Sequence, residues 1–410
     1  MTLAIHGGSP VRTGTPLPSA LTSAGRTIGV EEELAVLRVL RSGVLNGVWG
    51  PEVPALAREF AELMGSEHAV ACSSGTAALH LAVAAVDPAP GDEIIVPPIS
   101  DMGSVAPILA QNAVPVFADV DPITGCLDVS DVEAKITART RAIMVVHLFG
   151  KVAEVERLRA LADRAGILLI EDCAQAYLAP VRPGGPFAGT IGHIGCFSLQ
   201  QYKHITTGDG GLAITDDPAL ARSMRLFADK GWPRDGGERA YLSFALNYRM
   251  SELTAAVGRE QLRKLPGVVE RRRAGAARLS KCLDGTPGLT LPPDTGDHVY
   301  WYFPLIIDNL DSDGLRLYAA ALAAEGVPAI AGYLARPLYA EPVLRDGKAY
   351  GGSGFPTRGR MEYPDGLCPT AESLVARRLV VVPWNENFSE RDVDDIAAAI
   401  TKVHAEVVPA

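Results

Sequence analysis

Residues 196–211 contain the sequence Cys196-Phe-Ser-Leu-Gln-Gln-Tyr-Lys203-His-Ile-Thr-Thr-Gly208-Asp-Gly-Gly211. A short apolar stretch precedes one lysine, and a glycine-rich turn follows it. Upstream, the apolar run Ile167-Leu-Leu-Ile-Glu-Asp172 ends in an aspartate, and Gln175 stands three residues further on. A lysine that can form a Schiff base and a carboxylate that can pair with a pyridinium nitrogen are what pyridoxal 5'-phosphate (PLP) requires of a protein. These two segments predict a PLP site.

Short apolar runs alternate with helix-like segments around these motifs. The runs 93–96, 114–118, 142–146, 167–170, 194–197 and 212–215 are continuously hydrophobic, which is typical of strands buried on both faces. A capping-box pattern at Ser130-Asp-Val-Glu133 predicts a helix to about Ala138, and 153–165 predicts a clearer one. The pattern indicates an α/β domain with a mostly parallel central sheet and helices on both faces.

The character of the chain changes after Glu252. Residues 253–265 and the arginine-rich segment after them predict long helices, and Val299–Ile307 predicts a strand. Residues 345–370, rich in Gly, Pro and charge, predict a long loop. We therefore expect an N-terminal segment over 1–30, a large PLP-binding domain over 31–265 and a smaller C-terminal α+β domain over 266–410.

Composition narrows the class of protein. The 410 residues are 48% hydrophobic, and the formal net charge is −10, from 38 basic and 48 acidic residues. An acidic chain without a long basic run is a poor partner for nucleic acid or an anionic membrane. The six cysteines are scattered without a C-x-x-C pair, and no stretch is apolar enough for a membrane helix. We expect a soluble cytoplasmic protein with reduced thiols.

Each candidate residue can also be interpreted as an ordinary structural residue without a role in cofactor binding. A lone lysine before a turn is usually a solvated surface residue, and Asp172 after a strand could be an ordinary helix cap. Ser73-Ser-Gly75-Thr76 opens a helix-like run, where free N–H groups favour a phosphate, although an ordinary cap fits that segment equally well. Ser198 and Asn247 are further candidates for phosphate contacts.

Three other signals are discounted. His147 ends a predicted strand, and a hydrogen-bonded histidine is more common there than a metal ligand. No histidine pair has zincin spacing, so we predict no metal site. Gly208-Asp-Gly-Gly211 lacks the dinucleotide fingerprint and is interpreted as a turn that passes close to the lysine.

Four motifs occur in order: Ser74-Gly-Thr-Ala-Ala-Leu79, Glu171-Asp-Cys-Ala-Gln175, the lysine segment, and Asn247-Tyr-Arg-Met-Ser-Glu252. Together they resemble the DegT/StrS-type family of PLP-dependent sugar and aminocyclitol aminotransferases, of fold type I. The resemblance runs from Gly7-Gly-Ser-Pro to Cys368-Pro-Thr, nearly the whole chain.

The resemblance implies a role for each motif. Lys203 would bind PLP covalently and shuttle the proton, Asp172 would pair with the pyridine nitrogen, and Gln175 would lie beside the phenolic oxygen. Gly75, Thr76 and Ser198 would hold the phosphate, with Asn247 reaching it from the partner subunit of a homodimer. Glutamate or glutamine would supply the amino group, and a ketosugar or ketocyclitol would receive it.

The sequence departs from the family at a few positions. Where members usually carry an aromatic residue over the cofactor ring, this chain has Asp101, and we expect Met102 to cover the ring instead. Asp209 stands where a glutamate is usual.

Four further residues are candidates for substrate contacts. Gln200 and Gln201 resemble the version found in enzymes that act on inososes rather than nucleotide-linked sugars, but both could equally be supports of the site. Lys230 and Trp232, in the Lys230-Gly-Trp-Pro-Arg234 segment, and the 345–370 loop are substrate candidates or plain surface.

Two alternatives stay open at this point. A PLP-fold sugar dehydratase would carry histidine in place of the lysine, so Lys203 counts against it. A non-catalytic PLP-binding regulator is disfavoured because every residue that the chemistry needs is present.

Overall fold

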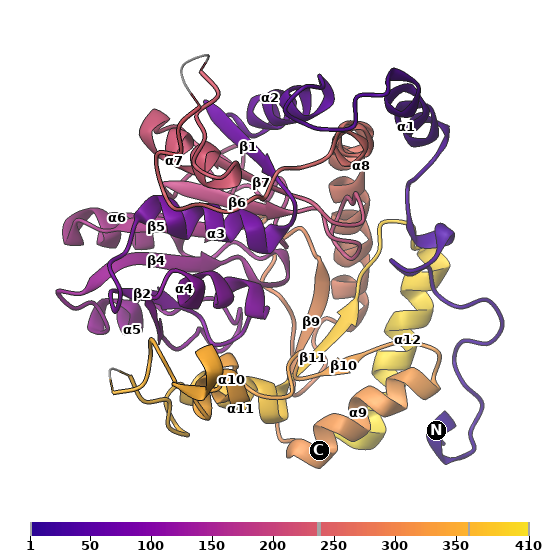
Figure 1. Cartoon of the computed structure of the whole chain (residues 1–410). Helices are drawn as coiled ribbons and strands as arrows, with labels where there is room; N and C mark the ends of the chain where they lie inside the picture. The colour runs from indigo at the N-terminus through magenta and orange to yellow at the C-terminus, as the bar shows by residue number, and fades with distance from the viewer. Residues whose placement is uncertain (1, 236–238, 360, 409–410) are drawn as a thin grey trace.

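The computed structural model describes residues 2–235, 239–359 and 361–408. Its centre is a seven-stranded sheet in the order β1-β7-β6-β5-β4-β2-β3 (Figure 1). The strands are β1 (His68–Cys72), β2 (Glu93–Val96), β3 (Val114–Phe117), β4 (Thr140–Val146), β5 (Leu168–Asp172), β6 (Ile194–Ser198) and β7 (Gly211–Thr215). Pairs among β2 to β6 are parallel, and β7 runs antiparallel to both β1 and β6. The predicted mostly parallel sheet is confirmed.

Helices pack on this sheet, with α3 against β6 and β7 and α6 against β4 and β5. The helices of the first two thirds of the chain are α1 (Val30–Ser42), α2 (Glu52–Met64), α3 (Gly75–Val86), α4 (Ala106–Ala110), α5 (Val129–Ala134), α6 (Val155–Ala165), α7 (Pro218–Ala228) and α8 (Glu252–Leu283). Helix α6 buries Leu158 and Leu161, as its pattern predicted.

A second sheet, in the order β10-β11-β9-β8, lies towards the C-terminus. Its strands are β8 (Leu289–Thr290), β9 (Tyr302–Ile307), β10 (Ile330–Ala331) and β11 (Leu379–Pro383). The helices of this region are α9 (Ser312–Ala324), α10 (Pro342–Arg345), α11 (Pro369–Ser373) and α12 (Glu390–Val407). In Figure 1, α12 and α9 lie side by side next to this sheet.

Three local predictions were wrong. The cap of α5 is Asp128, whose carboxylate accepts the N–H groups of Ser130 and Asp131, so the helix starts earlier than the capping-box pattern indicated and ends at Ala134. Strand β9 begins only at Tyr302, because Tyr300 has a φ of 50° and breaks the extended path. The two helices expected after Glu252 are one helix, α8, which continues through Pro266.

The hydrophobic core changes along α8. Leu262 and Leu265 belong to the core under the large sheet, whereas Leu279 and Leu283 belong to the core of the small one. Leu3 and Leu17 pack into that second core too. The division at residues 265 and 266 therefore falls inside a helix, and the proposed domain limits stay a prediction.

No helix within the described residues is long and apolar enough to cross a membrane.

Candidate active site

The candidate site lies at one edge of the large sheet, where several strands end. Strands β2, β4, β5 and β6 run the same way, and β1 joins them because it is antiparallel to β7, which is itself antiparallel to β6. Their carboxyl ends meet at this edge, as ligand sites in open α/β sheets do. A cavity of about 330 Å³ opens there, and its lining includes Lys203, Asp172, Asp101 and Asp209.

Lys203 lies in the turn after β6, half-buried, with its Nζ 4.2 Å from the centre of the Trp301 ring. Burial lowers the pKa of Lys203 to about 8, and the carboxylates of Asp172 and Asp101 oppose this shift. The ring face of Trp301 also favours the charged amine. Desolvation is the larger effect, so a sizeable fraction of the amine is neutral, and hence nucleophilic, near neutral pH.

Asp172 ends β5, opposite Val146 and Cys196 in the neighbouring strands. Its Oδ2 accepts the hydroxyl of Ser104 at 2.8 Å, and its Oδ1 accepts the N–H of Ala174 at 3.1 Å. Burial raises the pKa of Asp172 above its ordinary value, while these hydrogen bonds and the charge of Lys203 lower it. A buried carboxylate that is oriented by two hydrogen bonds suits a cationic ring nitrogen, which would provide the opposite charge.

The start of α3 forms a cradle suited to phosphate. Ser74 caps the helix by accepting the N–H of Ala77, and the first-turn N–H groups of Gly75 and Thr76 have no acceptor inside the helix. A Cβ on Gly75 would lie 2.5 Å from the Cβ of Ser198. Only glycine therefore allows the loop to approach Ser198 so closely. Gly75, Thr76 and Ser198 line the same cavity, where the free N–H groups of the helix N-terminus favour an anion.

Gln175 lies deeper than predicted for a direct contact. Its side chain is buried and accepts the N–H of Phe149 at 2.6 Å, and it also hydrogen-bonds the hydroxyl of Tyr333. Tyr333 lines the cavity, whereas Gln175 does not. In this structure Gln175 supports a wall of the site.

Asp101 lines the cavity, and its Oδ1 accepts the N–H of Gly103 at 2.8 Å. Met102, expected to cover the cofactor ring, is outside the cavity lining and packs against the hydrophobic core instead. The structure therefore does not bring Met102 to the position that the sequence suggested.

Sequence reasoning missed an aromatic wall formed by Trp301, Tyr302 and Tyr333. The rings of Trp301 and Tyr302 stack with centroids 4.0 Å apart. Arg272 holds this segment by donating to the carbonyls of Tyr300 and Trp301. The sequence signal was the run Val299-Tyr-Trp-Tyr-Phe, which was interpreted only as a strand.

The side chains of the two glutamines before the lysine have different surroundings. Gln200 lines the cavity, and its Oε1 accepts the N–H of Tyr202 at 2.8 Å. Gln201 lies outside the cavity lining and donates to the carbonyl of Ala20 at 2.6 Å. Gln201 is therefore a support of the site in this chain, which was the alternative interpretation of the pair.

The remaining candidates lie away from this cavity. Trp232 lines a separate groove of about 790 Å³ along α2, β1 and α7, where the Arg234 guanidinium stacks 3.8 Å from its ring centre. Lys230 and Asn247 are outside the cavity lining, and Asn247 is exposed. The segment 345–370 also contributes nothing to this lining among its described residues, and its Tyr350 and Tyr363 instead hydrogen-bond backbone of α4 and β3.

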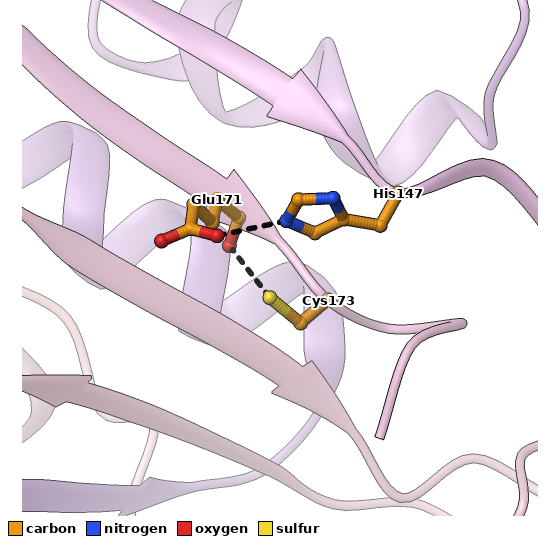
Figure 2. Close-up of side chains that lie close together, drawn as sticks. All are labelled: His147, Glu171 and Cys173. Atoms are coloured by element: carbon orange, nitrogen blue, oxygen red, sulfur yellow. Dashed lines mark hydrogen bonds and ion pairs between the residues drawn. The ribbon is translucent and has the colours of Figure 1, made fainter. Parts of the chain in front are cut away.

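A second polar cluster lies at the ends of β4 and β5. His147, Glu171 and Cys173 come close enough to share a metal ion (Figure 2). However, the Nε2 of His147 lies 2.8 Å from the Glu171 carboxylate, and its Nδ1 accepts the N–H of Ala153. The Glu171 carboxylate also accepts three backbone N–H groups, those of Gly189, Ile191 and Gly192.

Burial also raises the pKa of Cys173 well above its ordinary value, so the thiol stays protonated. The potential ligand atoms of His147 and Glu171 are thus engaged in hydrogen bonds. The prediction of a hydrogen-bonded histidine at a strand end is confirmed.

The residues of the cavity fit PLP. A partly neutral lysine amine, a buried carboxylate and a glycine cradle at a helix N-terminus match the carbonyl, ring nitrogen and phosphate of that cofactor. When bound, PLP supplies an electron sink for charge that develops on a substrate carbon. Lys203 would hold and move the proton at its Nζ, and Asp172 would stabilise positive charge at the ring nitrogen.

Comparison with known proteins agrees with this geometry. The model of the DegT/DnrJ/EryC1/StrS aminotransferase family matches residues 26–401. The L-glutamine:2-deoxy-scyllo-inosose aminotransferase of Streptomyces kanamyceticus is 38% identical, covering 98% of this chain and 96% of the relative. The GDP-perosamine synthase of Caulobacter vibrioides is 32% identical, covering 94% of this chain and 99% of the relative.

A solved structure of S. venezuelae DesV, in complex with a ketimine intermediate, has a TM-score of 0.80 at 32% identity. The match covers 91% of this chain and 94% of that one.

Proposed function

Because the chain belongs to the DegT/DnrJ/EryC1/StrS aminotransferase family, whose members depend on PLP, we propose that it aminates the keto group of a cyclitol or sugar with glutamine or glutamate as donor. The observation that carries the proposal is the joint presence of Lys203, Asp172 and the Gly75 cradle in one cavity. Lys203 is the catalytic residue, and Gly75, Thr76 and Ser198 hold the phosphate. A dehydratase would need histidine at position 203.

The charge of the cavity favours an acceptor without a nucleotide. Among the described residues, its charged lining comprises the carboxylates of Asp101, Asp172 and Asp209 and one cation, Lys203. A nucleotide diphosphate would bring further negative charge to this surface, whereas a neutral polyol could donate hydroxyls to Asp101 and Gln200. We therefore assign an unlinked, inosose-like ketocyclitol as the acceptor, in keeping with the acceptor in the name of the Streptomyces kanamyceticus relative.

Acceptor assays test this assignment. With L-glutamine as donor, we expect turnover of 2-deoxy-scyllo-inosose and little turnover of nucleotide-linked 4-ketosugars. In Asp101→Asn, which keeps the shape but removes the charge, the preference for the unlinked acceptor should fall by about tenfold, because like charges across an interface disfavour binding. Turnover of nucleotide-linked sugars alone would contradict the acceptor assignment and leave the aminotransferase activity standing.

A homodimer is part of the same proposal. An exposed apolar strip runs along α1, through Trp49, to the segment before Asn247, and it comprises Leu34, Leu37, Leu40, Trp49, Tyr241, Leu242 and Phe244. The segments that carry these side chains lie near one another, since Asn46, between α1 and Trp49, bridges to Ser251, and Arg234 lies 5.9 Å from the Trp49 ring. Phe244 is 90% exposed, which is unusual for a large apolar side chain in a monomer. Because Asn247 borders this strip and lies outside the cavity of its own chain, a second copy on the strip supports the phosphate contact that the family implies.

Sedimentation analysis tests the dimer. The wild-type protein should sediment as a dimer, and Phe244→Asp should shift it towards the monomer and lower its PLP affinity. The matched control is Leu317→Asp on α9, an exposed leucine far from the strip in sequence, which should stay dimeric. A fully active wild-type monomer would contradict the proposal.

A cytoplasmic location is also proposed. The six cysteines are free thiols, five of them buried, which suits a reducing compartment.

A further inference from the structure

The turn that carries Lys203 presents three successive backbone carbonyls, and side chains from distant parts of the chain bind all three. Arg26 donates to the carbonyls of Gln201 and Lys203, the latter at 2.8 Å. The Nε1 of Trp301 donates to the carbonyl of Tyr202 at 2.7 Å. Trp301 was already placed in the site by its ring, but Arg26 lies outside the cavity lining. The proposed function alone gives Arg26 no role.

Arg26 belongs to an N-terminal strap, residues 19–27, that hydrogen-bonds the lysine turn. Its Nε donates to the carbonyl of Ala20, and the same carbonyl accepts the side chain of Gln201 at 2.6 Å. Strap and turn are thus joined by reciprocal hydrogen bonds. Arg26 is only 8% exposed, so these bonds are shielded from water.

The strap is itself anchored at two other places. Asn385 and Asn387, after β11, donate to the carbonyls of Gly25 and Ala24. Gln261 and Lys264 of α8 donate to the carbonyl of Thr27. These anchors fix the position of the Arg26 guanidinium relative to both sheets. A guanidinium held in this way can in turn fix the backbone of the lysine turn.

The chemistry of Arg26 is unusual for a buried cation. Within the described residues, each of its hydrogen bonds goes to a backbone carbonyl, whereas a buried arginine usually pairs with a carboxylate. The neighbouring Glu386 is already paired with Arg272 at 2.7 Å. Burial lowers the pKa of Arg26 to about 10, so it is still charged at neutral pH. A planar fork that spans two carbonyls fixes a turn better than a lysine could.

We propose that Arg26 is a positioning residue for Lys203: it holds the backbone of the turn so that Nζ stays between Asp172 and the Trp301 ring, ready for the carbonyl carbon of PLP. The role of Lys203 in this inference rests on the proposed function, but the hydrogen bonds from Arg26 to the turn exist in the protein without cofactor. Loss of the hold should therefore be visible before any cofactor or substrate is added.

Hydrogen exchange of the cofactor-free protein tests the hold. In Arg26→Met, the amides of residues 199–207 should exchange about tenfold faster, because hydrogen bonds from a charged donor are lost. One of these amides is the N–H of Lys203, which donates to the Gln200 carbonyl. The matched control is Arg12→Met, which removes another N-terminal arginine that pairs with Asp392 and Asp395 of α12 and does not touch the turn. Unchanged exchange at 199–207 in Arg26→Met would overturn the proposal.

PLP binding distinguishes two roles of Arg26: positioning Lys203, and merely attaching the N-terminal strap to the turn. Arg26→Met should bind PLP about tenfold more weakly, and the pH midpoint of the visible band of the PLP-loaded protein should shift, while Arg12→Met keeps both values. If Arg26→Met does not fold, Arg26→Lys serves, since it keeps the charge but reaches only one carbonyl; wild-type PLP affinity and midpoint in that variant would overturn the proposal. Neither outcome depends on transaminase turnover, so failure of the proposed function would be seen separately.

Discussion

Replacement of Lys203 by alanine is expected to abolish both the visible absorption band of PLP bound to the protein and the aminotransferase activity. Its Nζ is the amine that the cavity places between Asp172, Asp101 and the Trp301 ring. Without it the protein loses the covalent attachment point and the group that moves the proton. Loss of a positioned proton-transfer group alone lowers rates by about 10²–10⁴-fold. The band should appear in the wild-type protein and bleach when glutamine or glutamate is added.

Two matched variants accompany this experiment. Lys203→Arg keeps the positive charge but not the nucleophile, and it should be as inactive as Lys203→Ala. Lys230→Ala, a lysine outside the cavity lining, should keep the band. A band that persists in Lys203→Ala would refute the assignment of the lysine.

The pH dependence of PLP attachment follows from the same environment. Burial lowers the pKa of Lys203 to about 8, so about half of the amine is neutral at that pH, compared with less than about 1% for an ordinary lysine. The rate of covalent attachment, measured by mixing cofactor-free protein with PLP, should rise with pH and level off above about 8. A rate that keeps rising towards pH 10 would mean that the amine is solvated.

Replacement of Asp172 by asparagine is expected to lower kcat by about 10- to 100-fold and to weaken PLP binding, since it removes a charge-assisted hydrogen bond. The isosteric change keeps an acceptor for the hydroxyl of Ser104, so the fold should be preserved. Turnover and PLP affinity measured on the same preparation give the result. Wild-type kcat in Asp172→Asn would contradict the proposed contact with the ring nitrogen.

Two serine variants test whether the contribution of Asp172 depends on the charge of its carboxylate. Ser104 donates its one hydroxyl proton to Asp172 and so accepts that of Ser100, at 2.7 Å. Ser104→Ala removes a donor that lowers the pKa of Asp172, so that pKa rises and the acid limb of the pH–rate profile should move to higher pH. Ser100→Ala, one step removed, should move the limb less.

The sequence predicted most of the large sheet because its strands are buried on both faces. In strands such as Glu93–Val96 and Ile194–Ser198 every residue is buried, so most of each strand is a continuous apolar run in the sequence. Prediction was weaker where tertiary contacts decide the local structure. Helix α8 passes through Pro266 since packing into two cores outweighs the local penalty of proline. The start of β9 is set by the turn at Tyr300, which no periodicity reveals.

Within the site, residues that follow a strand or open a helix were predictable, as Asp172 and Gly75 illustrate. The position of Met102 was not, because Asp101 forms a turn with Gly103 that brings the aspartate and the glycine, and not the methionine, to the cavity. Trp301 and Ser104 were missed for a related reason. They reach Lys203 and Asp172 from about 100 and 70 residues away in the sequence, and local patterns carry no information about contacts of that kind.

Helix α8 limits how this protein could be divided or recombined. At 1.5 Å per residue its 32 residues extend about 48 Å, and the two ends belong to different cores. A chain cut near residue 265 would leave one fragment without the end of its helix, and it would leave the other with an exposed apolar face around Val269 and Trp301, which pack into the core under the large sheet. The two parts are therefore not interchangeable modules, and grafting the C-terminal part of a relative onto this chain would require the whole helix to be exchanged with it.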